Sequence, residues 1–244
     1  MHDAVVIDRR FRGPPDSANG GYACGLVAAR LTPEPAVEVT LRLPPPLDRP
    51  LAVEGDGKGA RLLDGDALVA EGRPAAAPAA EPPAVASLEE AERARRDSPM
   101  QHEHPYPTCF VCGPEREPGD GLRVTCGPVE DRGLVAAPFE ATAEMDAGDG
   151  SVRHEFVWSA LDCPSGIAGM LVPESGVSVL GRLTAQILRP LDAGEVYVAI
   201  GWPIAQEGRK QFAGSAIVDR EGEPMAVARA TWIEVGEQRP ENGS

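Results

Sequence analysis

The sequence predicts an α+β fold in which a helix followed by four antiparallel strands occurs twice. An apolar, glycine-containing segment at residues 18–31 precedes a series of alternating segments, and the same order returns after residue 154. A proline- and alanine-rich stretch, residues 73–86, separates the two series. This repeat indicates two similar helix-on-sheet units that pack as a pseudo-dimer with a continuous sheet.

The first copy begins with the helix expected over residues 18–31, where small and apolar side chains dominate. Apolar and polar residues then alternate from 36 to 43, as they do in a half-buried strand. Glycines, prolines and the Asp64-Gly65 pair mark tight turns between the segments that follow. The remaining predicted strands of this copy are residues 50–55, 58–66 and 67–72.

The second copy repeats this order at larger size, beginning with a long apolar helix at residues 154–171. The Asp219–Gly222 turn joins its last two strands. Its predicted strands are 177–188, 194–208, 209–222 and 223–235, with two earlier candidates at 122–124 and 134–138.

A short helix is predicted between the copies. Ser87 with Glu90 three residues later fits a capping box, so residues 88–97 should be helical, and their charged surface is typical of a solvated connector. The predicted organisation is an N-terminal unit at 1–73, a linker with this helix at 74–105, a C-terminal unit at 106–237 and a tail at 238–244.

Composition narrows the possible functions. A net charge of −15 opposes binding to phosphate backbones, so no nucleic-acid partner is expected. The sequence has no run of 18 apolar residues and no apolar core near its start, so neither a membrane span nor a secretory signal is expected. Five cysteines are an odd number, which favours a cytoplasmic protein with reduced thiols.

Three segments resemble motifs of one known enzyme family. Residues 109–124, CFVCGPEREPGDGLRV, resemble the stretch that precedes the first strand in that family. Asn19-Gly20-Gly21 resembles the His-Gly-Gly that opens its central helix, and Ala160-Leu161-Asp162 resembles the acidic motif within that helix. Together these segments resemble the hotdog-fold thioesterases of the phenylacetyl-CoA type, and the resemblance implies two fused hotdog units.

The same resemblance implies an active site shared between units. In that family a glycine N–H at one helix start polarises the thioester carbonyl, and a carboxylate on the other helix acts as base or nucleophile. It therefore implies Asp162, Gly20 and Gly21 as catalytic residues here, an acyl-CoA or related thioester as substrate, and no cofactor.

Each copy has only one of these two features, the glycine pair or the acid. In the family's spacing the acid falls nine residues after the start of the glycine triplet, and that count leads from Asn19 to Ala28. Counting back from Asp162 leads to Arg153, which is followed by His154 and no glycine pair. We therefore expect a single composite site per chain and an inactive mirror-related one.

Each candidate also has a simpler interpretation. Glycine N–H groups at a helix start suit a developing oxyanion, but the two glycines could merely permit close packing. A buried Asp162 needs a partner or a purpose, but it could instead lie on a polar helix edge before Pro164. Asn19 could contact substrate or act as the helix N-cap.

Further expectations concern the substrate and the cysteines. The other substrate-contact candidates are Tyr22, Trp158, Ser165 and Arg182, with core packing for the tryptophan and a solvated face for the arginine as the alternatives. Cys109 and Cys112 form a CxxC that could hold zinc with His104 upstream, but the resemblance explains the pair without a metal. Cys163 is expected to be a small core residue.

Two rival functions remain to be weighed. A hydratase of this fold would need a histidine after the acid, and no histidine follows Asp162. A non-catalytic protein that binds acyl-CoA or another hydrophobic ligand stays open as the alternative. Fused units of this type often pair further, so we expect a dimer of the double unit.

Overall fold

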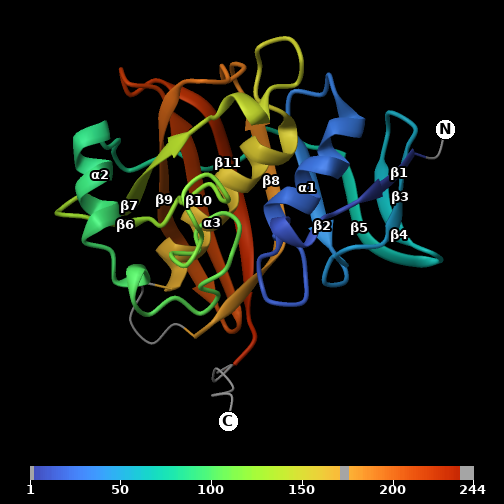
Figure 1. The fold of residues 1–244 in the computed structure, drawn as a ribbon, viewed down its shortest axis with the longest axis horizontal. Coiled ribbons are helices and arrows are strands. Elements are labelled where there is room, and N and C mark those ends of the chain that lie inside the picture. The colour runs from blue at the N-terminus through green and yellow to red at the C-terminus, as the bar shows by residue number, and fades with distance from the viewer. Residues whose placement is uncertain (1–2, 171–175, 237–244) are drawn as a thin grey trace.

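All strands of the described chain belong to one antiparallel sheet, against which the two principal helices pack side by side (Figure 1). The computed structural model describes residues 3–170 and 176–236. The strand order is β1-β3-β4-β5-β2-β8-β11-β10-β9-β7-β6. The N-terminal and C-terminal strands therefore occupy separate halves of the sheet, and β2 and β8 meet at its centre.

The N-terminal half contains α1 (Gly20–Ala28) and the strands after it. The four predicted strands are present, as β2 (Val37–Leu41), β3 (Pro50–Gly55), β4 (Ala60–Asp64) and β5 (Ala67–Pro74). An additional edge strand, β1 (Asp3–Val6), pairs with β3.

The C-terminal half contains α3 (His154–Met170), in agreement with the predicted helix except for residue 171, which lies outside the described residues, as does the predicted tail at 238–244. The Asp219–Gly222 turn is confirmed by the hydrogen bond from the Gly222 N–H to the Asp219 carbonyl. The strands of this half are β6 (Gly127–Val129), β7 (Leu134–Glu140), β8 (Ser178–Ile187), β9 (Val196–Glu207), β10 (Lys210–Val218) and β11 (Pro224–Glu234).

The predicted strand at 122–124 is wrong. Arg123 has a φ of 54°, which interrupts the extended backbone that a strand requires. Its neighbours instead form loop hydrogen bonds, from the Leu122 N–H to the Phe110 carbonyl and from the Val124 N–H to the Val111 carbonyl. This loop packs on the C-terminal half and brings the CxxC segment towards α3.

The halves are joined by the sheet and by the two helices. Strand β2 pairs with β8 in a register that places Val39 opposite Leu183, and both side chains are fully buried. The helices α1 and α3 touch closely because a β-carbon on Gly21 would lie 2.5 Å from the Asp162 β-carbon, and one on Gly25 would lie 2.4 Å from the Glu155 α-carbon. Only glycine permits this approach.

Helix α2 (Leu88–Arg96) is not a free connector. Its predicted capping box is confirmed: the Ser87 hydroxyl accepts from the Glu90 N–H at 3.2 Å, and the Glu90 carboxylate accepts from the Ser87 N–H at 2.8 Å. Ala91 and Ala94 are buried against β6 and β7, in a small core separate from the main one. The solvated-connector interpretation was therefore wrong.

The sheet is covered on both faces in its C-terminal half. Successive residues of a strand point to opposite faces. On β9, Tyr197 and Ala199 belong to the main core with α3, while Val198 and Ile200 belong to the small core with α2. None of the helices in the described ranges is long and apolar enough to cross a bilayer.

Candidate functional site

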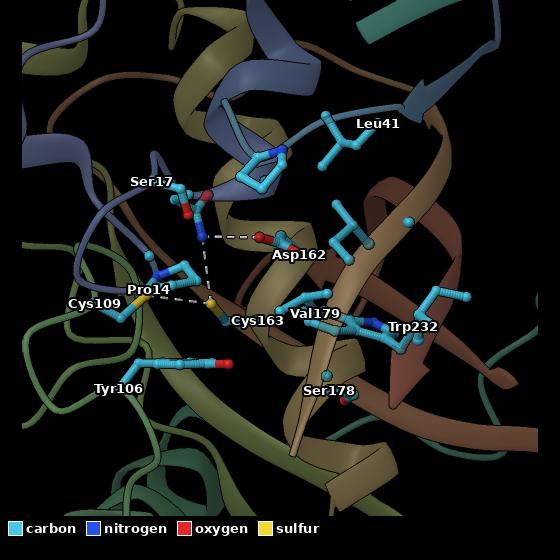
Figure 2. Close-up of a pocket in the computed structure, with 18 of the residues that line it drawn as sticks. Pro14, Ser17, Leu41, Tyr106, Cys109, Asp162, Cys163, Ser178, Val179 and Trp232 are labelled. Atoms are coloured by element: carbon cyan, nitrogen blue, oxygen red, sulfur yellow. Dashed lines mark hydrogen bonds between the residues drawn. The ribbon is translucent and has the colours of Figure 1, made fainter. Parts of the chain in front are cut away.

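A cavity of about 450 Å³ opens where the start of α1, the middle of α3 and the central strands meet. Figure 2 shows Asp162 and Cys163 on one wall, Leu41 and Val179 beside them, and Tyr106 across the space. The larger apolar side chains that line it are Leu41, Leu43, Ile167, Met170, Leu180 and Trp232. Both halves of the chain therefore contribute to one pocket.

Asp162 lies where the two helices cross. Its side chain is 1 % exposed, and it projects from α3 towards the first turn of α1. Its Oδ2 accepts hydrogen bonds from the Gly21 N–H at 2.9 Å and from Asn19 Nδ2 at 2.8 Å. The structure thus brings Asp162 against two residues that lie more than 140 positions before it in the sequence.

The two carboxylate oxygens of Asp162 differ in their surroundings. Asp162 lines the pocket, and its buried Oδ1 has no hydrogen-bond partner within the described residues. Burial raises the pKa of this carboxyl to about 7, against the opposing effect of the Gly21 N–H and the Asn19 amide. An oxygen buried without a partner is costly unless a ligand or water completes it.

Asn19 has one of the two roles that its sequence position left open, that of the helix N-cap, and its predicted contact with substrate stays a prediction. It is the N-cap of α1, with its Oδ1 accepting from the Tyr22 N–H at 2.9 Å. Its Nδ2 faces α3, where it donates to Asp162 and approaches Cys163 Sγ at 3.7 Å. The cap fixes the amide orientation, so the donor end must point at the carboxylate.

The two glycines differ in their surroundings. The N–H of Gly21 donates to Asp162 Oδ2, so it faces the carboxylate rather than an open space. Gly20 lines the pocket, and a β-carbon there would lie 2.9 Å from a methyl carbon of Leu180. Gly20 is also the first residue of α1, where backbone N–H groups lack partners within the helix.

Tyr22 and Trp158 lie outside the residues that line the pocket. The Tyr22 ring stacks on Phe11, with centroids 4.2 Å apart, and is surrounded by Phe110 and Phe156. Trp158 is buried on α3, and its carbonyl faces Gly21. The Tyr22 side chain supports the crossing of the helices because its ring packs on Phe156 of α3, and Trp158 belongs to the main core.

Ser165 and Arg182 also do not line the pocket. The Ser165 hydroxyl donates to the Asp162 carbonyl at 2.7 Å and accepts from Trp232 Nε1 at 2.9 Å, which anchors the indole that forms part of the pocket wall. Arg182 Nε donates to Thr40 Oγ1 at 3.0 Å, on the surface where β8 meets β2.

Arg42, which sequence reasoning missed, lies at the pocket instead. It follows β2, lines the cavity and is half exposed. Its Nε donates to Glu71 at 2.9 Å. Its only sequence signal was its place at the end of the predicted strand 36–43, where a turn back towards α1 begins.

Three thiols converge beside Asp162. The Sγ atoms of Cys109, Cys112 and Cys163 all lie within 4.8 Å of one another, and all three residues are buried and line the pocket. His104 Nε2 lies 3.2 Å from Cys112 Sγ. Sequence reasoning paired the CxxC with His104 but treated Cys163 as core, because nothing local connects positions 54 residues apart.

The mirror-related position on the helix pair has different chemistry. Ala28, where the family's spacing would place the acid, is buried and supplies no carboxylate. On the α3 side, Glu155 forms an ion pair with Arg153 at 3.4 Å, and His154 Nδ1 lies 3.5 Å from Thr32 Oγ1. The carboxylate-and-amide arrangement at Asp162 is thus not repeated there.

Comparison with solved structures identifies the fold. No protein-family model matches the chain, and no curated protein matches it. The tesB protein of Mycobacterium avium subs paratuberculosis aligns over 95 % of this chain and 92 % of its own, with 11 % identity and a TM-score of 0.62. A proposed thioesterase II of Thermobifida fusca YX aligns over 94 % of this chain and 91 % of its own, with 16 % identity and a TM-score of 0.57. The predicted tandem double hotdog is confirmed as a fold by these alignments, which span nearly the whole chain.

Proposed function

We propose that this chain hydrolyses an acyl thioester at the Asp162 site. The observation that carries the proposal is the difference between the two oxygens of that carboxylate. One oxygen is held by Asn19 and the start of α1, and the other is buried at the pocket without a partner in the described chain. A carboxylate that is oriented on one side and open on the other is arranged to act on a bound molecule.

The proposed reaction uses water as the nucleophile. Oδ1 of Asp162 accepts a proton from a water molecule as the water oxygen bonds to the carbonyl carbon. The carbonyl oxygen gains charge, and the N–H of Gly20 at the positive end of α1 is the candidate donor to it. The C–S bond then breaks, the proton passes to the leaving sulfur, and a carboxylic acid and a free thiol are released.

The pocket favours an acyl-CoA as the thioester. Its volume of about 450 Å³ lies within the range of small-ligand sites, and its walls are largely apolar, which suits an acyl group. Arg42 at the pocket offers a guanidinium to a phosphate of the carrier. A net charge of −15 opposes an acidic carrier protein more than it opposes a small cofactor held by one local cation.

A non-catalytic acyl-CoA binder is the alternative, and the loss of the mirror-related acid at Ala28 favours it. A hydrolysis screen separates the two functions. Free thiol is measured with DTNB over short, long and aryl acyl-CoAs, with retention of each acyl-CoA measured in parallel. Thiol release above background from at least one acyl class supports hydrolysis. Retention without release from any of them favours the binder.

Narrowing the pocket should change substrate affinity more than the chemical step. Val179 lines the pocket and is partly exposed on β8, so tryptophan can replace it while occupying space that an acyl group needs. We expect Val179→Trp to raise KM for long and aryl substrates about tenfold or more, because their binding energy is lost. Steady-state kinetics on matched acyl-CoAs measures this.

The matched control is Gln186→Trp, a partly exposed position on the same strand that does not line the pocket. Its KM values should stay near those of the wild type. Equal KM changes in both variants would contradict the assignment of the pocket to the acyl group.

Pairing of two double units, like a cytoplasmic location, stays a prediction from the sequence.

A further inference from the structure

We propose that Cys109, Cys112 and Cys163 form a zinc site on the wall of the pocket, with the three thiolates as ligands and His104 as a hydrogen-bond donor to them. The test of this site is independent of the proposed hydrolysis, because metal content can be measured without any substrate. The site would tie the loop that carries the CxxC to α3, one residue after Asp162.

The spacing of the sulfurs fits a tetrahedral ion. Zinc–thiolate bonds of about 2.3 Å in a tetrahedron place neighbouring sulfurs roughly 3.8 Å apart. Cys109 Sγ and Cys163 Sγ are 3.9 Å apart, and all three sulfurs fall within 4.8 Å of one another. This separation is far above the roughly 2.05 Å of a disulfide bond, so the cysteines are free thiols in this arrangement.

The loop before β6 is shaped to present two of the ligands. The Gly113 N–H donates to the Cys109 carbonyl at 2.9 Å, which closes a tight turn around the CxxC. A β-carbon on Gly113 would lie 2.4 Å from the Pro107 carbonyl oxygen, so this turn requires glycine. Both sulfurs lie within 4.8 Å of the Cys163 sulfur on α3, and Figure 2 shows Cys109 beside Cys163.

Two side-chain nitrogens approach the sulfurs, as partners around a metal site do. His104 Nε2 lies 3.2 Å from Cys112 Sγ. Asn19 Nδ2 approaches Cys163 Sγ at 3.7 Å. These donors balance the negative charge that three thiolates leave on a bound zinc ion.

His104 is placed as a donor rather than as a fourth ligand. Its Nδ1 accepts from the Tyr106 N–H at 2.9 Å, so the neutral ring carries its proton on Nε2. That proton faces Cys112 Sγ at 3.2 Å. With three protein ligands, a bound zinc ion would have a fourth coordination position for water or for a molecule in the pocket that the cysteines line.

The test begins with the wild-type chain, purified with a phosphine reductant and without chelators. Elemental analysis should find about one zinc ion per chain, as expected for a site of this kind. Replacing zinc with cobalt should give thiolate-to-metal charge-transfer absorption and the strong visible bands of a tetrahedral site. This spectrum needs no variant, so it decides the question even where a substitution prevents folding.

Variants then locate the ion. Cys163→Ser should lower zinc affinity at least tenfold in competition with a chromogenic chelator, because one of three thiolates is lost. Cys24→Ala removes a buried thiol of α1 that is outside the cluster, and its zinc affinity should match the wild type.

Three results would overturn the proposal. The first is a folded, reduced wild type with neither zinc nor a cobalt–thiolate spectrum. The second is an equal loss of zinc in Cys24→Ala and Cys163→Ser. The third is a Cys109–Cys163 disulfide, detected by mass spectrometry after the free thiols of the native protein have been alkylated.

Discussion

Asp162→Asn is expected to lower kcat for a responsive acyl-CoA by roughly 10²–10⁴, the usual contribution of a general base. The amide keeps the size of the carboxylate, and its oxygen can still accept from the Gly21 N–H and Asn19 Nδ2. The fold should therefore survive while Oδ1, the candidate base, is replaced by a group that cannot take a proton. Steady-state kinetics and urea unfolding, measured on the same preparation, give both quantities.

Asp162→Ala should show how much the Asp162 side chain contributes to stability. It removes the acceptor for two buried donors, which costs about 1–3 kcal/mol of unfolding free energy for each donor left unsatisfied. Glu155→Gln is the matched control on α3, since Glu155 faces the mirror-related position and is paired with Arg153. Its kcat should be close to that of the wild type. Unchanged hydrolysis in both Asp162 variants would contradict the assigned site.

Gly21→Ala is expected to damage stability and activity together. Alanine favours a helix over glycine by about 1 kcal/mol. The added carbon, however, would lie 2.6 Å from the Trp158 carbonyl oxygen as well as 2.5 Å from the Asp162 β-carbon. Overpacking of this kind costs roughly 1–3 kcal/mol, so the net effect on unfolding free energy should be destabilising. Moving α1 away from Asp162 should also lower kcat at least tenfold, because Asn19 and the helix start hold that carboxylate.

Gly25→Ala separates the two effects. It forces the same two helices apart one turn later, where the added carbon would meet the Glu155 α-carbon at 2.4 Å. We expect a comparable loss of unfolding free energy with a smaller loss of kcat. The assignment of α1 as a positioning element would be wrong if the two variants lost equal activity at equal stability.

Local patterns in the sequence were sufficient for most of the fold. The strand of residues 36–43 alternates, the 154–171 helix is long and apolar, and Ser87 with Glu90 forms a cap through neighbours three residues apart. These features depend on periodicity and short-range contacts, which a single sequence displays. The edge strand Asp3–Val6 was missed because four residues give too little alternation to recognise.

Long-range contacts explain what the sequence did not display. The meeting of Gly21 with Asp162 was expected only through a family resemblance, and its form was not: the glycine N–H binds the carboxylate itself. The approach of Cys163 to Cys109 depends on a loop that turns at Arg123, whose positive φ no residue pattern announces. Arg42 lies at the pocket because β2 ends beside β8, which is a property of the assembled sheet.

The proposal that two unlike halves form one ligand site per chain is tested most directly by binding stoichiometry. The ligand is a non-hydrolysable thioether analogue of the best substrate, titrated into the wild-type chain by isothermal calorimetry. Asp162 and the start of α1 meet at one place in the described chain, and the mirror-related position lacks the acid. We therefore predict a single saturable site per chain. Two equivalent sites per chain, or no saturable binding to a folded protein, would contradict it.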